Sequence, residues 1–309
     1  MFSHLLLPLT GTDLDRPAIA HARDLALESG GTVELMYVLE GPAGGPQAVD
    51  AVEWHARRLA GQAYLEQVTA QLADAGLTVS HCLPEGRVTE HIVHRAHQGA
   101  DLLVLPTGAS GHGHVGAVEG QVLWRSFVST LLVRGDAPAR HGGSLYGTVL
   151  VALDGSQRAE CVLPAVRFLA ERFGAHVILA HVVEEPSVPR PLPPVAEERQ
   201  LAARLVELNT AAATQYLGDL ATGLGNGAET RLVAGRRAAP VLHELVRECE
   251  PDLVVMSAHG YGGDHTWPFG EVTTNLIGYG PTPLLVIHDL PWQERAARQS
   301  DATEEEWGG

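Results

Sequence analysis

Two polar segments in the second half of the chain could bind an anionic ligand. Asp154-Gly155-Ser156 follows one apolar run, and Ser257 to Gly263 (SAHGYGG) follows another. A glycine-rich turn lets backbone N–H groups face an anion, and a helix starting after Gly270 would add partial positive charge. The Asp154 carboxylate could accept hydrogen bonds from a ribose or a base across the same crevice. A helix N-cap at Asp154 and an ordinary connecting loop explain these residues equally well.

Other candidate clusters carry weaker chemistry. His91, His94 and His97 recur at every third residue on an expected helix, and imidazoles so placed could bind zinc. No cysteine or carboxylate completes a recognisable ligand spacing, so we expect a solvated helix face and no metal site. Ser156 and His181 suggest nucleophilic catalysis, but Ser156 lacks the Gly-x-Ser-x-Gly context of a nucleophile elbow. We therefore expect no catalytic residue and no enzyme, with a slow ATPase as the remaining catalytic alternative.

Composition excludes several classes of function. The 309 residues include 37 acidic and 21 basic side chains, for a net charge of −16, and every basic residue is arginine. A strongly acidic chain repels nucleic acids and anionic lipids, so we expect neither as a partner. Without lysine, the chain can form no P-loop site and no Schiff base. The three cysteines are well separated, and we identify no signal peptide and no apolar run that approaches about 18 residues. These features predict a cytoplasmic protein without a membrane segment.

The chain contains an internal repeat with an initial offset of 144 residues. Leu5 to Leu9 aligns with Val149 to Leu153, and Gly30 aligns with Gly174. After a short insertion, Asp101 aligns with Asp252. A repeat of this size indicates a duplicated domain. We expect two domains, over residues 1–138 and 147–289. A glycine-rich linker over residues 139–146 joins them, and a flexible acidic tail covers residues 290–309.

Each copy alternates short apolar runs with helical patterns. Thr148 to Leu153 is apolar and β-branched, as in a strand buried on both faces. Cys161 to Phe173 has helical spacing and is followed by Gly174. This alternation predicts an α/β fold with a doubly wound, parallel, five-stranded (Rossmann-like) sheet in each copy. Ligands of such sheets bind beyond the carboxyl ends of the strands, where the strand order reverses.

The second copy resembles the universal stress protein family. The run from Val149 to Ser156 (VLVALDGS) is similar to the opening strand of that domain. The family has a Gly-x2-Gly-x9-Gly-Ser/Thr loop before its last helix, and Ser257-x2-Gly260-x9-Gly270-Glu271 has the same spacing. The last strand of the family is a short apolar run opened by proline, as in Pro281 to Ile287. The resemblance covers nearly the whole chain as two tandem domains.

The resemblance implies a ligand and a set of binding residues. In nucleotide-binding members of the family, the first-strand aspartate and a second-strand valine hold adenine and ribose, and the glycine loop holds the phosphates. A stress-response protein that binds ATP or AMP, with Mg²⁺ accompanying the nucleotide, is therefore implied. By motif position the implied binding residues are Asp154, Val182, Met256, Ser257, His259, Gly260, Gly270, Glu271 and Val272.

The chain departs from the family motif in both copies. In the second copy, Ser257 replaces a glycine, Tyr261 replaces a common basic residue, and Glu271 replaces the Ser/Thr donor. A carboxylate at position 271 would repel a triphosphate, whereas AMP or adenosine would be affected less. In the first copy, Thr10 replaces the aspartate and the loop from Pro106 to Gly116 departs from the spacing. We therefore expect a degenerate site in the first copy.

Two hypotheses of different classes follow. The first is a stress-adaptation protein whose second copy binds an adenine nucleotide and whose conformation is recognised by protein partners. The second is a dimerisation scaffold for stress-signalling partners that binds no nucleotide. Tandem proteins that resemble this one pack as an intramolecular pseudo-dimer through their last strands. The resemblance thus implies contact between Leu131 to Val133 and Leu284 to Val286, with a homodimer as a further form.

Overall fold

The computed structural model describes residues 1–41, 50–108, 115–135, 145–186, 195–225, 227–261 and 268–289. The chain divides into two compact units between residues 141 and 142, called unit 1 and unit 2 below. The expected tail over 290–309 and most of the expected linker over 139–146 lie outside the described residues. Within the described ranges, no helix combines the length and the apolar character that a membrane span requires.

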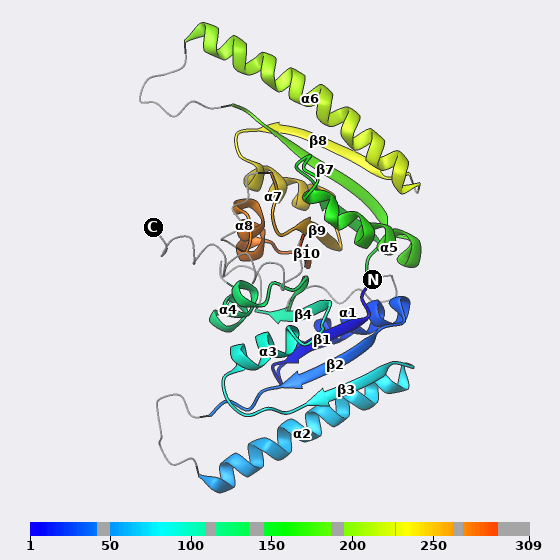
Figure 1. Ribbon diagram of the computed structural model, residues 1–309, viewed down its shortest axis with the longest axis vertical. Helices are drawn as coiled ribbons and strands as arrows, with labels where there is room; N and C mark the ends of the chain where they lie inside the picture. The colour runs from blue at the N-terminus through cyan, green and yellow to red at the C-terminus, as the bar shows by residue number, and fades with distance from the viewer. Residues whose placement is uncertain are drawn as a thin grey trace, which may run out of the picture. The chain divides into compact units, whose positions relative to one another are not determined.

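Unit 1 alternates strands and helices from β1 (His4–Leu9) to β5 (Thr130–Arg134) (Figure 1). Its strand order is β3-β2-β1-β4-β5, and neighbouring strands are parallel. The order reverses between β1 and β4, so the sheet is doubly wound. The elements between β1 and β5 are α1 (Asp15–Ser29), β2 (Thr32–Tyr37), α2 (Ala51–Asp74), β3 (Thr78–Cys82), α3 (Val88–Ala96), β4 (Leu102–Thr107) and α4 (Ala117–Ser126).

Unit 2 repeats this plan from β6 (Thr148–Ala152) to β10 (Leu284–Ile287). Its strand order is β10-β9-β6-β7-β8, again with parallel neighbours. The structure thus confirms the predicted five-stranded parallel sheet and Rossmann-like fold of each copy. The remaining elements are a 3₁₀ turn η1 (Ala159–Val162), α5 (Leu163–Phe173), β7 (His176–Glu184), α6 (Ala196–Leu224), β8 (Glu229–Gly235), α7 (Ala238–Cys249), β9 (Leu253–Ser257) and α8 (Glu271–Tyr279).

The first strand of each unit is buried on both faces, which explains its unbroken apolar run. Residues 5–7 of β1 and residues 149–151 of β6 are all 0% exposed. The first helices, α1 and α5, end at Gly30 and Gly174, each with a φ of 65°. Glycine adopts this left-handed conformation without strain, so both caps follow from the sequence repeat.

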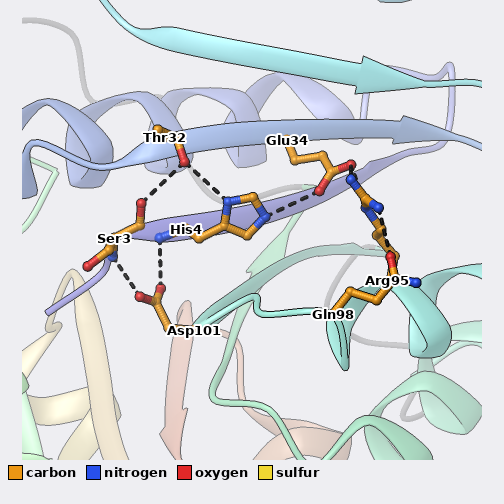
Figure 2. Close-up of polar contacts among 7 residues, drawn as sticks. All are labelled: Ser3, His4, Thr32, Glu34, Arg95, Gln98 and Asp101. Carbon is orange, nitrogen blue, oxygen red and sulfur yellow. Dashed lines mark hydrogen bonds and ion pairs between the residues drawn. The ribbon is translucent and has the colours of Figure 1, made fainter.

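An aspartate holds the beginning of the first strand in each unit. In unit 1, Asp101 accepts hydrogen bonds from the backbone N–H groups of Ser3 (2.8 Å) and His4 (3.1 Å), as Figure 2 shows. In unit 2, Asp252 accepts one from the N–H of Thr148 at 2.8 Å. The aligned aspartates of the repeat therefore have a structural role: each joins the start of its first strand to the strand that pairs beside it.

A buried ionic cluster fixes α3 on the sheet of unit 1. Glu34 of β2 is 2% exposed, and its Oε1 lies 2.6 Å from Nη2 of Arg95 on α3. Its other carboxylate oxygen lies 3.2 Å from Nε2 of His4, so that the two partners approach Glu34 from opposite sides (Figure 2). A carboxylate is tolerated inside a protein when it is paired and hydrogen-bonded. The glutamate in an otherwise apolar strand is explained by these two partners.

A buried histidine makes the stability of unit 1 depend on pH. His21 lies on the core face of α1 and is 5% exposed, and burial lowers its pKa from 6.5 to about 4. Between pH 6.5 and 4, the unfolded chain binds a proton that the folded chain does not. The neutral His21 therefore costs the folded state nothing above pH 6.5. As the pH falls from 6.5 to about 4, the free energy of unfolding decreases by about 3 kcal/mol, because the unfolded chain takes up the proton first.

We predict that His21→Leu reduces the slope of the unfolding free energy against pH by the amount that corresponds to about one bound proton. The measurement is the free energy of unfolding in urea at several pH values between 7 and 4.5. His55→Leu is the control, because His55 is exposed on α2. Equal slopes in the wild type and His21→Leu would contradict the assignment, whatever the absolute stability of the variant.

Candidate functional site

A cavity of about 830 Å³ lies in unit 2 beyond the carboxyl ends of β6, β7 and β9. Because β6 lies between β7 and β9, the cavity is at the point where the strand order reverses. Helix α6 closes one side, and the beginnings of α7 and α8 form the rim. Its inner wall is largely apolar and includes Val182, Ala213, Leu242 and Met256.

Eight of the nine residues predicted from the sequence line this cavity. The structure does not bring the ninth, His259, into it, because that side chain is 0% exposed and lies behind the loop. His259 Nδ1 lies 3.4 Å from Asp289 Oδ1, and Arg158 Nε lies 2.8 Å from the other oxygen of Asp289. His259 thus anchors the loop to the end of β10. The eight lining residues are Asp154, Val182, Met256, Ser257, Gly260, Gly270, Glu271 and Val272.

Asp154 joins the two polar loops of the cavity. Its Oδ1 accepts hydrogen bonds from the backbone N–H (3.0 Å) and the hydroxyl (2.6 Å) of Ser156. Its Oδ2 accepts one from the backbone N–H of Tyr261 at 2.5 Å, across the crevice. The helix N-cap considered for Asp154 is not formed, because Arg158 is the residue before η1 and Asp154 contacts its own turn and the glycine loop. The carboxylate therefore positions the glycine loop against the end of β6.

The contact with Asp154 explains a glycine of the loop. A Cβ atom at Gly260 would overlap Asp154 Oδ2, whereas a Cβ at Gly270 would meet nothing closer than the Ala258 carbonyl oxygen at 3.8 Å. Ser257 occupies the first glycine position of the motif because its hydroxyl turns back and donates to the His259 carbonyl at 2.6 Å. The space at Gly260 is therefore the stricter requirement.

Glu271 is paired with an arginine that the sequence analysis missed. Arg237, just before α7, places Nη2 2.5 Å from Glu271 Oε1 at the first residue of α8, and both side chains are largely exposed. The pair neutralises the carboxylate that was expected to stand alone at the rim. The signal in the sequence was the dipeptide Arg236-Arg237 directly after β8, at the same edge of the sheet as Asp154.

Tyr216 of α6 is a second residue that the sequence analysis missed. It lines the cavity, and its buried hydroxyl makes no hydrogen bond of normal geometry within the part of the chain that the structure describes. Burial and the nearby carboxylates of Glu160 and Asp154 raise its pKa above the usual 10. The signal was a Tyr-Leu pair present in both long helices, at Tyr64 on α2 and Tyr216 on α6.

In unit 1, a buried carboxylate takes up the donors at the end of the first strand. Asp15, 0% exposed at the start of α1, accepts hydrogen bonds at 2.8 Å from the backbone N–H groups of Thr10 and Gly11. It also accepts one from the Tyr64 hydroxyl at 2.8 Å. Thr10, expected in place of the ligand-binding aspartate, therefore faces a side chain of its own unit.

An aromatic ring fills the adjoining space of unit 1. Tyr37, at the end of β2, occupies the repeat position of His181 in unit 2. Cβ atoms added at Gly11 or Gly61 would lie 2.9 and 3.0 Å from the Tyr37 ring, so the ring packs between these two backbones. Tyr37 also meets Tyr64 edge-on, with ring centroids 6.3 Å apart. Residues 109–114 of the first-copy loop lie outside the described residues.

The three histidines of α3 and its C-cap form separate hydrogen bonds. His91 and His97 each contact a backbone carbonyl, at 3.0 and 2.9 Å, and His94 contacts the Gln98 side chain at 2.8 Å. Over the described ranges, no group of three or more potential metal ligands converges. The spacing that suggested zinc therefore serves local contacts.

We predict that Gly260→Ala breaks the Asp154–Tyr261 hydrogen bond, because the added methyl group takes the position of the carboxylate oxygen. The measurement is amide hydrogen exchange at Tyr261, which should become as fast as in Asp154→Ala. The double variant should exchange no faster than either single one, since both remove the same contact. Gly270→Ala is the matched control and should leave the exchange rate unchanged. Slow exchange in Gly260→Ala would show that the loop is held by other contacts.

Comparison with known proteins gives the family. The universal stress protein family profile matches residues 1–134 and 145–288. A universal stress protein from Mycolicibacterium smegmatis is 26% identical over 234 residues, 72% of this chain and 75% of that protein. The crystal structure of a universal stress protein from Archaeoglobus fulgidus has a TM-score of 0.66 at 16% identity and covers 94% of this chain and 100% of its own. A functionally unknown protein from Pseudomonas aeruginosa PAO1 has a TM-score of 0.68 at 14% identity, with 98% of each chain covered. These two structures share the fold, and the profile matches both units; the chain belongs to the universal stress protein family and carries two tandem domains of it.

Proposed function

We propose that unit 2 binds adenosine or an adenine nucleotide and that the protein is a ligand-responsive component of a stress response. The observation that carries the proposal is the cavity of about 830 Å³ at the strand-order reversal, lined by eight residues of the nucleotide motif. A volume of this size is in the range of small-molecule and cofactor sites.

The cavity offers a different surface to each part of such a ligand. Val182 and Met256 provide an apolar wall for a planar base. The Asp154 carboxylate at the rim can accept hydrogen bonds from ribose hydroxyls or a base amino group. The loop ends at Gly270, where the first N–H groups of α8 favour a phosphate oxygen. The arrangement suits a nucleoside with its base inside and its phosphate end at the rim.

The charges at the rim favour a ligand with few phosphates. Asp154, Glu184 and Glu271 are carboxylates, and Arg237 is already paired with Glu271. Glu184 accepts a hydrogen bond from the backbone N–H of Ala238 at 2.7 Å, which keeps its charge at the rim. A triphosphate must displace Glu271 from Arg237 or bring Mg²⁺ as a bridge. Adenosine or AMP avoids that cost.

The hydroxyl groups of the cavity support binding and not catalysis. The Ser156 hydroxyl donates a hydrogen bond to the Asp154 carboxylate at 2.6 Å, and the Ser257 hydroxyl donates one to the His259 carbonyl at 2.6 Å. A serine nucleophile needs a base that accepts its proton and passes it on, commonly a histidine. The His181 ring instead contacts the Leu153 carbonyl at 2.9 Å. The proposed activity is therefore reversible binding.

A second candidate function is a dimerisation scaffold that binds no nucleotide. The observation in its favour is that both oxygens of Asp154 already accept hydrogen bonds from the protein, so that a ligand must compete with Ser156 and Tyr261. In this case the last strands, β5 and β10, would serve as the association surfaces. A mass spectrum of small molecules released from the purified protein, with no nucleoside or nucleotide in it, would favour the scaffold.

We predict that Asp154→Ala weakens AMP binding at least tenfold, which corresponds to about 1.4 kcal/mol, because it removes the acceptor at the rim. The matched variant is Thr10→Ala, at the same repeat position in unit 1, and it should leave AMP binding unchanged. Titration calorimetry measures both affinities. Equal losses in the two variants, or no AMP binding by the wild type, would contradict the proposed site.

We predict that Glu271→Ser tightens ATP binding about tenfold in the absence of Mg²⁺, because it removes a negative charge and frees Arg237 for the phosphates. AMP should gain much less. The gain should disappear when Arg237→Gln is added. Glu90→Ser in unit 1 is the control, since Glu90 is also exposed and paired with an arginine. Titrations with ATP, with and without Mg²⁺, decide the matter: unchanged ATP affinity in both conditions would contradict the charge argument.

A further inference from the structure

The two units present the same donors after their first strands but differ in the acceptor. In unit 1 the Asp15 carboxylate accepts hydrogen bonds from Thr10 N–H, Gly11 N–H and the Tyr64 hydroxyl, each at 2.8 Å. The repeat places Ala159 of unit 2 at the position of Asp15. Ala159 is 2% exposed and lines the cavity. A buried carboxylate of one unit is therefore replaced by a methyl group and open space in the other.

The donors themselves persist in unit 2. Tyr216 corresponds to Tyr64, since each precedes a leucine of its long helix that is 1% exposed or less. The Tyr216 hydroxyl is buried and has no hydrogen-bond partner of normal geometry among the described residues, although the Glu160 carboxylate lies near it. The backbone N–H groups of Asp154 and Gly155 also donate to no other described residue, but both residues are exposed, so water can accept from them. A buried donor without a partner is costly, so the Tyr216 hydroxyl indicates a place for an acceptor from outside.

We infer that the end of the cavity between Ala159 and Tyr216 is a subsite for one uncharged oxygen acceptor of the ligand, a hydroxyl or a carbonyl. In this subsite the ligand oxygen takes the place that the Asp15 carboxylate has in unit 1. An uncharged group is expected because Asp154 and Glu160 lie close to Tyr216 and would repel an anion. The inference rests on the proposed function for the identity of the ligand, and a ribose hydroxyl of adenosine meets the description.

The test supplies an acceptor from the protein itself. Ala159→Asn places a side-chain oxygen where unit 1 has Asp15, and Ala159→Leu fills a similar volume without an acceptor. Each variant is made in the wild-type and in the Tyr216→Phe background. Thermal unfolding of the ligand-free protein and calorimetry with adenosine are the two measurements. Tyr64→Phe in unit 1 is the control for the tyrosine substitution.

We expect Ala159→Asn to raise the ligand-free unfolding midpoint by about 2 °C and Ala159→Leu not to raise it. The rise should vanish in the Tyr216→Phe background, because the new oxygen has lost its donor. Both substitutions at position 159 should lower adenosine affinity at least tenfold, since they fill the subsite. Tyr216→Phe should lower it severalfold, whereas Tyr64→Phe should leave it unchanged and destabilise unit 1.

Two results separate a failure of this inference from a failure of the proposed function. If the wild type binds adenosine and the position 159 variants bind it within twofold, the ligand does not use this end of the cavity and the inference is overturned. If the wild type binds no adenosine, the proposed ligand is wrong, and the ligand-free measurement alone decides. A stabilisation by Ala159→Asn that depends on Tyr216 then supports the acceptor subsite, and its absence overturns it.

Discussion

Backbone N–H groups at the end of the first strand of each unit need acceptors, and the way each unit meets this need sets the character of its crevice. Unit 1 meets it internally, because Asp15 accepts two backbone N–H groups and the Tyr64 hydroxyl. Unit 2 has alanine at the same position and retains a cavity there. One substitution between the copies, from a buried carboxylate to a methyl group, thus changes what accepts these donors, while unit 1 keeps a cavity of about 780 Å³ beside Gly11 and Tyr64. The aromatic ring of Tyr37 reinforces the difference in unit 1.

Two of the three departures of unit 2 from the nucleotide motif, at Ser257 and Glu271, are compensated by a local contact. Ser257 replaces a glycine without loss of space because its hydroxyl bonds the His259 carbonyl. Glu271 replaces a hydroxyl donor, and Arg237 pairs with it from the neighbouring helix. Such pairing between exposed groups contributes little to stability, and its effect is to set the charge that an incoming phosphate meets. For the proposed nucleotide site, this pairing would change the preference among ligands with different numbers of phosphates.

Much of the fold could be predicted because it depends on local sequence. Buried parallel strands require continuous apolar runs, and a helix that ends in the left-handed conformation favours glycine, so the strands and the caps at Gly30 and Gly174 were predictable. The resemblance to the family motif, in the first two strands and in the glycine loop, likewise pointed to eight residues that line the cavity. Helical periodicity fails to predict burial in the first part of α6. Leu201 and Leu208 share one face of this helix, but their side chains are 63% and 51% exposed. Helix α6 meets its sheet further along, at Ala213 and Leu217, and no local pattern gives that boundary.

The rest of the site depends on contacts between distant segments. Arg237 and Glu271 are brought together by two helices that begin at the same edge of the sheet, and Tyr216 reaches the cavity from α6. The direction of the His259 side chain follows from its partner Asp289 at the end of β10. A motif gives the positions of such residues along the chain, but the partner that turns each side chain lies far away in sequence. Internal comparison of the two copies reaches one of these residues, Tyr216, because the Tyr-Leu pair occurs in both long helices.

The ring of Tyr37 between Gly11 and Gly61 has a consequence for how the protein responds to changing ligand concentration. A tandem protein with two equivalent crevices could take up two ligands and couple them within one molecule. If unit 2 takes up the proposed ligand while Asp15 accepts the corresponding donors at Thr10 and Gly11 in unit 1, one chain binds one ligand, and its saturation curve is a simple hyperbola with a Hill coefficient of one. A sharper threshold then requires the association of separate chains. On the proposed function, duplication gives a graded sensor in which unit 1 can keep one shape whether or not unit 2 holds a ligand.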